Sequence, residues 1–157
     1  MSQGTDRLLE WAMSLPAFAD KGAAEAALFA KRDKQLDTLR SAAGSQSHFV
    51  YDESPESLKA LEAWYFTLHE KGSFESTGVS RKEFEIAMHF YFCQVLSKHA
   101  PGMKWVVEEN SIIPGKYSLG VGKPLFLYLV GDCSHLPLLR QNKRRQSMWR
   151  DFERYAR

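Results

Sequence analysis

Two histidines and two cysteines have the side-chain types that metal binding needs. His89 and Cys93 are four residues apart, which places both on one face of a helix, and Cys133 and His135 form a Cys-x-His pair later in the chain. Two thiolates and two imidazoles can complete a tetrahedral zinc site. Their spacing matches no compact zinc module, and cysteine is commonly buried as a small apolar residue. We therefore expect core residues here and assign no metal ligand, although the pattern alone leaves a site open.

The same helix face carries groups that could serve as an acid, a base and a nucleophile. Glu85, His89 and Cys93 recur every four residues. A thiol becomes a nucleophile when its pKa is lowered and a cleft exposes it. The many aromatic residues of this segment indicate ordinary burial, so we assign no catalytic or cofactor-binding residue and favour a non-enzymatic protein. A small enzyme that uses Glu85, His89 and Cys93, with or without zinc, is the first alternative.

A Gly-Val-Gly-Lys-Pro segment at residues 120–124 has some likeness to a phosphate-binding loop. It lacks the remaining glycine spacing, the Ser or Thr after the lysine, and a following helix. We interpret Gly122-Lys123-Pro124 as a turn between two strands, and we expect no nucleotide site.

The C-terminal segment is strongly basic. Residues 140–157 hold two acidic side chains against seven basic ones, namely Arg140, Lys143, Arg144, Arg145, Arg150, Arg154 and Arg157. Such charge is typical of a surface for nucleic acid or for an acidic partner. Trp149, Phe152 and Tyr155, however, have the spacing of a helix that docks on its own domain. A nucleic-acid-associated protein that uses this basic amphipathic helix is the second alternative.

Helical spacing of apolar residues predicts the elements that must position these groups. Helices are expected over residues 5–15, 22–43, 55–71, 81–98 and 136–155. Ser54 precedes Pro55 as an N-cap, and Ser80 with Glu83 forms a capping box for the fourth helix. That helix is apolar around most of its circumference, which predicts a central position.

Residues 104–130 change to a period of two, which predicts strands. The expected strands are 104–108, 116–121 and 125–130, and they would form an antiparallel meander. Residues 48–51 are either a short strand or an extended segment. The predicted fold class is therefore α+β, with helices packed on a small antiparallel meander and a C-terminal basic amphipathic helix.

Length and composition predict one soluble domain. The 157 residues are 44% hydrophobic and 25% charged, near the globular average. We expect a single domain over residues 1–157, with a helical region at 1–45, helices and the meander at 46–135, and the last helix at 136–157. No segment is long and apolar enough to span a bilayer, and two cysteines are too few for a disulfide framework. These features predict a cytoplasmic protein that does not bind membranes.

Charge is divided unevenly along the chain. Residues 1–80 carry 8 basic and 12 acidic side chains, a net charge of −4, whereas residues 81–157 carry 13 and 7, a net charge of +6. The overall charge is +2, and the excess of positive charge in the second half could attract an acidic partner.

Two stretches resemble a loose group of small bacterial domains of unknown function, some of which are immunity proteins encoded beside polymorphic toxins. One is the segment 52–58 with Leu61 and Trp64, and the other is Trp105-Val106-Val107 followed by residues 119–121. The resemblance covers roughly residues 50–130 and implies a packed scaffold without a transferable functional site.

We therefore predict a non-enzymatic protein-binding domain. The resemblance implies an immunity-type protein that neutralises a bacterial toxin by steric masking, which needs a stable scaffold and a complementary surface but no cofactor. The partner would be another protein, such as a cognate toxin. The sequence does not define the identity of that partner, the binding surface or the oligomeric state.

Overall fold

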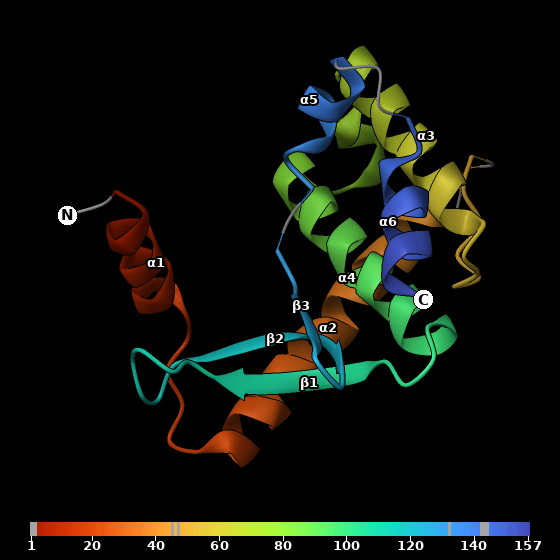
Figure 1. Ribbon diagram of the computed structural model, residues 1–157. Helices are drawn as coiled ribbons and strands as arrows, with labels where there is room; N and C mark the ends of the chain where they lie inside the picture. The colour runs from red at the N-terminus through yellow and green to blue at the C-terminus, as the bar shows by residue number, and fades with distance from the viewer. Residues whose placement is uncertain (1–2, 45, 47, 132, 142–144) are drawn as a thin grey trace.

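The protein consists of helices packed with a three-stranded antiparallel sheet at one side, which confirms the α+β class (Figure 1). The computed structural model describes residues 3–44, 46, 48–131, 133–141 and 145–157. In chain order the elements are α1 (Gln3–Ser14), α2 (Lys21–Ala43), α3 (Ser57–Lys71), η1 (Phe74–Thr77), α4 (Arg81–His99), β1 (Lys104–Glu109), β2 (Tyr117–Lys123), β3 (Phe126–Leu129), α5 (Leu136–Gln141) and α6 (Ser147–Tyr155).

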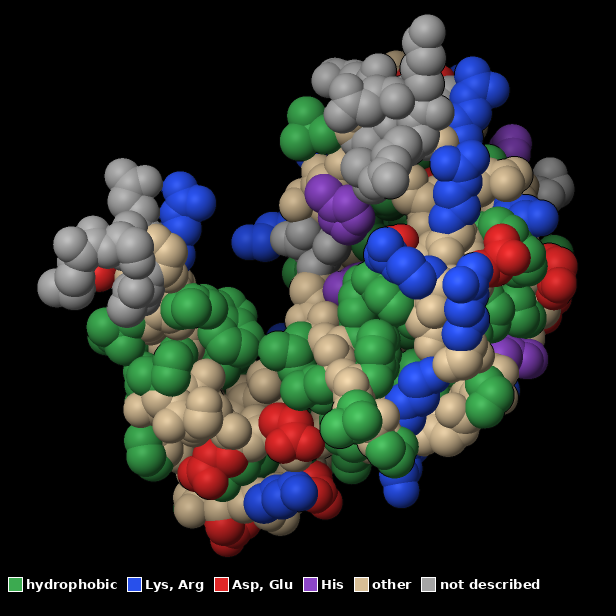
Figure 2. All heavy atoms as spheres, viewed as in Figure 1, with side chains coloured by type: hydrophobic (Ala, Val, Ile, Leu, Met, Phe, Trp, Pro, Cys, Tyr) green, Lys and Arg blue, Asp and Glu red, His purple; other side chains and the backbone are tan. Residues whose placement is uncertain are grey.

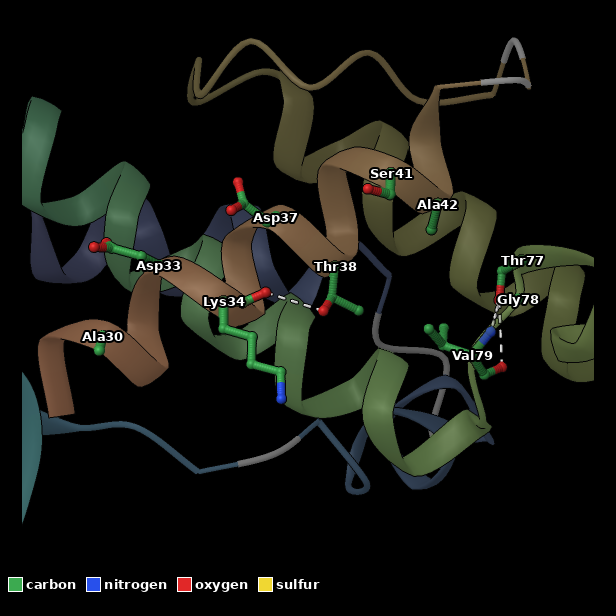
Figure 3. Close-up of a pocket in the computed structure, with 10 residues that line it drawn as sticks. All are labelled: Ala30, Asp33, Lys34, Asp37, Thr38, Ser41, Ala42, Thr77, Gly78 and Val79. Carbon is green, nitrogen blue, oxygen red and sulfur yellow. Dashed lines mark hydrogen bonds between the residues drawn. The ribbon is translucent and has the colours of Figure 1, made fainter. Parts of the chain in front are cut away.

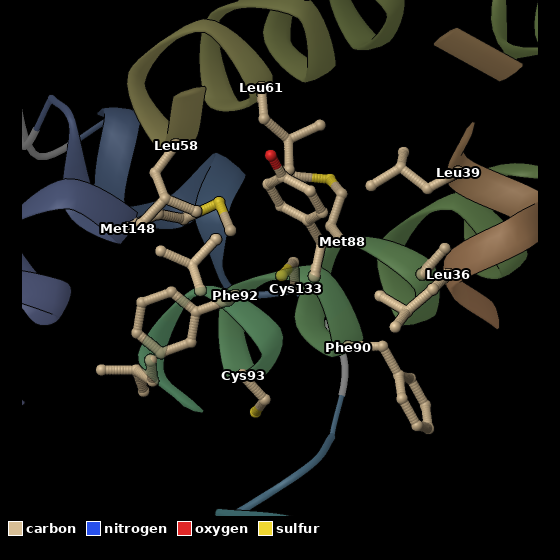
Figure 4. Packing of buried hydrophobic residues seen from close by; sticks show 14 of the residues in the cluster. Leu36, Leu39, Leu58, Leu61, Met88, Phe90, Phe92, Cys93, Cys133 and Met148 are labelled. Atoms are coloured by element: carbon tan, nitrogen blue, oxygen red, sulfur yellow. The ribbon is translucent and has the colours of Figure 1, made fainter. Parts of the chain in front are cut away.

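The fourth helix, α4, is the centre of the molecule. The predicted capping box is present, because the Ser80 side chain accepts from the Glu83 N–H while the Glu83 side chain accepts from the Ser80 N–H. Helices α2, α3 and α6 and strands β1 and β2 all pack on α4. Its apolar side chains are accordingly buried around most of the helix, within a cluster that includes Leu36, Leu39, Leu58, Leu61, Met88 and Phe92 (Figure 4).

The sheet is a meander in the order β1-β2-β3. Lys123 pairs with Phe126, so the turn consists of Pro124 and Leu125. The expected turn at Gly122-Lys123 is wrong, because both residues continue β2. Leu125 is fully exposed and has a φ of 63°, a left-handed value that is strained for a residue with a side chain.

Gly120 has a packing reason to be glycine. Strand β3 lies so close to Gly120 of β2 that a Cβ atom at this position would overlap the carbonyl oxygen of Tyr128. The glycine-rich segment therefore serves close strand packing, and the element directly after it is strand β3 rather than the helix that a phosphate loop requires.

One expected helix boundary needs correction. Helix α3 begins at Ser57 rather than at Pro55, because the N–H groups of Ser57 and Leu58 bond to the carbonyl groups three residues before them. Ser54 still accepts a hydrogen bond from the Ser57 N–H at 3.2 Å. Residues 48–51, for which a strand and an extended segment were both open, form no strand, and Phe49 packs in the core against Trp64.

The single C-terminal helix expected over 136–155 is also wrong. The described residues form two helices, α5 and α6, and Gln146 before α6 has a left-handed φ of 57° that interrupts helical geometry. Lys143, Arg144 and the side chain of Arg140 lie outside the described residues. Helix α6 is amphipathic as predicted, with Met148 and Phe152 buried. No helix in the described part of the chain could cross a lipid bilayer.

Candidate functional site

Glu85 is the first of the three spaced residues on α4, and the structure gives it structural partners. Its carboxylate is buried and accepts hydrogen bonds from the Tyr65 hydroxyl at 2.5 Å and from Arg81 Nε at 3.3 Å. Burial raises the pKa of Tyr65, and the adjacent Glu85 charge raises it further. The phenol therefore stays protonated and holds the carboxylate in place.

His89 bonds to the sheet and to the segment that follows it. The Gly131 N–H donates to Nδ1 at 2.5 Å, and Nε2 lies 2.6 Å from the Tyr128 hydroxyl. Because Nδ1 accepts, a neutral imidazole carries its proton on Nε2 and donates it to Tyr128. Both ring nitrogens are thus engaged in positioning β3 and its extension against α4.

Cys93 completes the row and is fully buried. Burial raises the pKa of its thiol, the opposite of what a nucleophilic cysteine needs. Glu85, His89 and Cys93 share one helix face as predicted, but Glu85 and His89 bond to different partners and Cys93 is enclosed. This arrangement provides no activated nucleophile.

The structure brings His89, Cys133 and His135 to one small cavity. Tyr128, Ser147 and Asp151 also line it, and its volume of about 10 Å³ is close to that of one water molecule. Both cysteines are free thiols and lie at different places in the buried cluster (Figure 4). Within the described residues, no group of three or more His, Cys, Asp or Glu side chains could hold a metal ion.

The basic residues of α6 are partly neutralised where the structure describes them. Arg154 forms an ion pair with Asp151 at 3.0 Å and a hydrogen bond to the Tyr155 hydroxyl at 2.9 Å. The Lys59 ammonium group lies over the Trp149 ring, 4.3 Å from the ring centroid. These aromatic residues pack against the protein and do not form an exposed stacking surface.

A broad hollow follows the outer side of α2 (Figure 3). It has a volume of about 700 Å³ and lies between α2 and the segment Thr77–Val79. Asp33, Lys34 and Asp37 project from α2 into solvent there, so the hollow is open and carries charges of both signs. Nothing in this arrangement selects a particular ligand.

A second hollow, of about 300 Å³, is a groove between α1 and the rest of the molecule, lined mainly by apolar side chains together with Lys31, Tyr117 and Ser118. Figure 2 shows the notch between these parts, with hydrophobic side chains gathered at its base. Trp11 and Leu15 form the wall on the side of α1. The opposite wall consists of side chains from α2, α4, β2 and the end of β3, namely Leu28, Ile86, Phe90, Leu119, Leu129 and Val130.

Helix α1 is attached to the sheet at a short anchor. The Phe18 N–H donates to the Gly115 carbonyl at 3.0 Å, and the Tyr117 N–H donates to the Pro16 carbonyl at 3.1 Å. Beyond this anchor α1 stands apart from the other helices (Figure 1). Leu8, Leu9, Trp11 and Met13 on α1 are 58%, 44%, 42% and 60% exposed, so the helix presents an apolar surface beside the groove.

Most of the chain matches one known protein family. A family model described as uncharacterised protein YwmA matches residues 17–156. The chain belongs to the YwmA family. No curated protein and no solved structure matches it.

The YwmA-family segment contains the anchor and the larger wall of the groove. Ala17, where the match begins, forms the bridge to Lys116, and the groove residues of α2, α4, β2 and β3 all lie within the matched range. Helix α1 with Trp11, and Leu15 directly after the helix, precede the matched range. The groove therefore combines a wall of the YwmA-family scaffold with a helix outside the matched residues.

Sequence reasoning missed one residue that organises this YwmA-family fold. Glu62 of α3 is 3% exposed, and its carboxylate accepts from the N–H groups of Ser147 and Met148 at 3.1 and 3.2 Å. It thus caps α6, whose own N-cap residue makes no side-chain bond. Glu62 lies in an apolar stretch of α3, but nothing local in the sequence identifies its distant partner.

Proposed function

We propose that this protein is a non-catalytic protein-binding domain whose binding surface is the groove together with the exposed face of α1. The observation that carries this proposal is the apolar surface shared by Leu8, Leu9, Trp11 and Met13 beside an apolar hollow. Contiguous exposed apolar surface of this kind is typical of interaction sites, because water solvates it poorly.

The character of the surface supports a protein partner rather than a reaction. Lys31 is the one charged side chain among the described residues that line the groove. The titratable residues Glu85, His89 and Cys93 are buried. The apolar surface also continues along α1 beyond the hollow, over a length that suits an amphipathic helix of a partner better than a small molecule.

The resemblance to immunity proteins supports a more specific proposal, that the partner is a toxin. The mechanism would be steric, because this protein would cover the surface through which a toxin binds in the groove. Growth rescue tests it: the product of the adjacent gene is expressed alone, then with this protein. Toxicity that the wild-type protein relieves and that Ile86→Glu fails to relieve supports the proposal, and a harmless neighbour or rescue by Ile86→Glu contradicts it.

The protein-binding proposal itself is tested by site-specific photo-crosslinking in the source cell. A photoreactive amino acid at Ile86 lies in the groove, whereas the same amino acid at Val50, which is 68% exposed, lies outside it. We expect a discrete protein adduct from position 86 that reconstitutes with purified partner and is lost with an acidic substitution in the groove. Equal adducts from both positions, or none from position 86, would overturn the proposal.

A further inference from the structure

Helix α1 is too short and too exposed to be stable alone. It has 12 residues, and isolated helices of this length are marginal in water. Among the α1 side chains that the structure describes, Ala12 alone is buried. Its stability therefore requires that something packs against its apolar residues.

Apolar residues of α1 and of its C-terminal end form two stripes on different sides of the helix. Leu8 and Trp11 of α1 and Leu15, which directly follows the helix, have helical spacing, and Trp11 and Leu15 already line the groove of the same chain. Leu9 and Met13, four residues apart, form the second stripe, and both point away into solvent. If α1 rotated so that Leu9 and Met13 entered the groove of the same chain, Trp11 and Leu15 would lose their contacts there.

Charge identifies the occupant that fits both the second stripe and the groove. Asp6 and Glu10 are four residues apart and flank Leu9 and Met13 on the helix surface, and both are exposed. The groove presents the exposed Lys31 among its apolar lining residues. An apolar ridge with an acidic flank thus lies on the same chain as an apolar groove with a basic residue.

We propose that the protein forms a two-fold symmetric dimer in which α1 of each copy lies in the groove of the other. Each copy then supplies one ridge and one groove, so a single set of contacts is used twice. Leu9 and Met13 become buried, and Asp6 or Glu10 faces Lys31 of the other copy. This inference rests on the proposed function, because it assumes that the groove binds protein, and it names a second copy of the chain as the occupant that fills the groove until another partner displaces it.

The test is the oligomeric state of the full chain by sedimentation velocity over a wide range of concentration. We expect a concentration-dependent dimer of the wild-type protein. Lys31→Glu places acid against acid and should weaken the dimer by at least about tenfold. The double substitution Asp6→Lys/Glu10→Lys places base against base and should weaken it to a similar degree. Lys34→Glu makes the same change on α2 outside the groove and should leave the dimer unchanged.

Mixing the two weakened variants distinguishes reciprocal exchange from other dimers. The acidic α1 of the Lys31→Glu variant can face the unchanged Lys31 of the Asp6→Lys/Glu10→Lys variant. The basic α1 of the Asp6→Lys/Glu10→Lys variant can face the glutamate at position 31 of the first variant. An equimolar mixture should therefore recover a heterodimer. A wild-type monomer at every concentration, or a mixture that stays monomeric, overturns the dimer. The groove proposal would survive either result if crosslinks from Ile86 still reach a different protein, and it would fall if they reach none.

Discussion

The carboxylate of Glu62 lies at the N-terminus of α6 and accepts a hydrogen bond from the Ser147 N–H at 3.1 Å. A second bond from Met148 occupies the other oxygen. Burial raises the pKa of Glu62, while the hydrogen bonds from the Met148 and Ser147 N–H groups oppose that shift. One side chain of α3 thereby fixes where α6 begins and how it lies against α3 and α4.

Replacing Glu62 should detach the start of α6. Glu62→Ala leaves two N–H groups at a buried helix terminus without these acceptors, so we expect a loss of roughly 2 kcal/mol or more in the free energy of unfolding. Urea unfolding followed by circular dichroism measures it. Glu75→Ala, at an exposed position, is the control and should change stability by less than about 0.5 kcal/mol. Equal effects from both substitutions would contradict the capping role.

The contacts of His89 predict one tautomer. Nδ1 accepts from the Gly131 N–H, so the neutral ring should carry its proton on Nε2. Long-range nitrogen–proton correlation NMR distinguishes the two tautomers directly. In Tyr128→Phe, which removes the hydroxyl bonded to Nε2, we expect a loss of about 1 kcal/mol of stability and a shift of the Nε2 resonance. A proton found on Nδ1 would refute the assigned bonding.

The buried phenols predict a loss of stability at alkaline pH. Burial raises the pKa of Tyr51 to about 12, helped by the negative charge of Glu53, and burial also raises the pKa of Tyr91 to about 12. An unfolded tyrosine titrates near pH ~10. Because the folded values are higher, their contribution to stability is complete below pH ~10 and is lost as the pH rises through about 12.

Tyrosinate absorbance and urea midpoints over that pH range provide the measurement. We expect native absorbance to lag behind that of the denatured chain. The double variant Tyr51→Phe/Tyr91→Phe should show a shallower loss of stability between the unfolded pKa of about 10 and the native pKa of about 12. A variant that declines as steeply as the wild type would show that other groups control the alkaline transition.

Gly120 should not tolerate a side chain. The Cβ of Gly120→Ala would overlap the Tyr128 carbonyl oxygen, and backbone cannot move aside as a flexible side chain can. We expect destabilisation of about 1 to 3 kcal/mol, measured by thermal unfolding. Gly22→Ala, where the nearest atom beyond the chain neighbours lies at an ordinary 3.4 Å, should be neutral or slightly stabilising.

Thiol reactivity tests the burial of the two cysteines. Cys93 is fully buried and Cys133 is 2% exposed. A thiol-specific reagent should therefore label neither in the native protein, and both should react together when urea unfolds it. Rapid labelling of one thiol under native conditions would show that it is accessible and would reopen the case for a reactive site.

Local signals account for the elements that were predicted well. The Ser80–Glu83 capping box defines the start of α4 within four residues, and Gly72 ends α3 with a left-handed φ of 60°. The alternation in residues 116–121 and the apolar runs at 105–107 and 125–130 identified the three strands, which pair as an antiparallel meander. These features depend on neighbours in the sequence, so one chain is enough to recognise them.

The features that were missed depend on contacts between distant residues. Glu62 meets Ser147 across 85 positions, and the turn at Pro124–Leu125 follows from the pairing of β2 with β3. The groove was not predicted either, because helical spacing in α1 shows an apolar face but not whether that face is covered. Spacing did place Glu85, His89 and Cys93 on one face, and only the structure shows what partners they have.

Trp11 lines the groove, so its fluorescence should report whether the groove is occupied. All four tryptophans are described; Trp64 is buried, Trp105 and Trp149 are half-buried, and Trp11 is the most exposed. Water around an indole ring shifts its fluorescence to longer wavelengths, and transfer to an apolar contact reverses the shift. The intrinsic emission of the unlabelled chain should therefore move to the blue whenever the groove fills, and Trp11→Phe should abolish that signal without closing the groove.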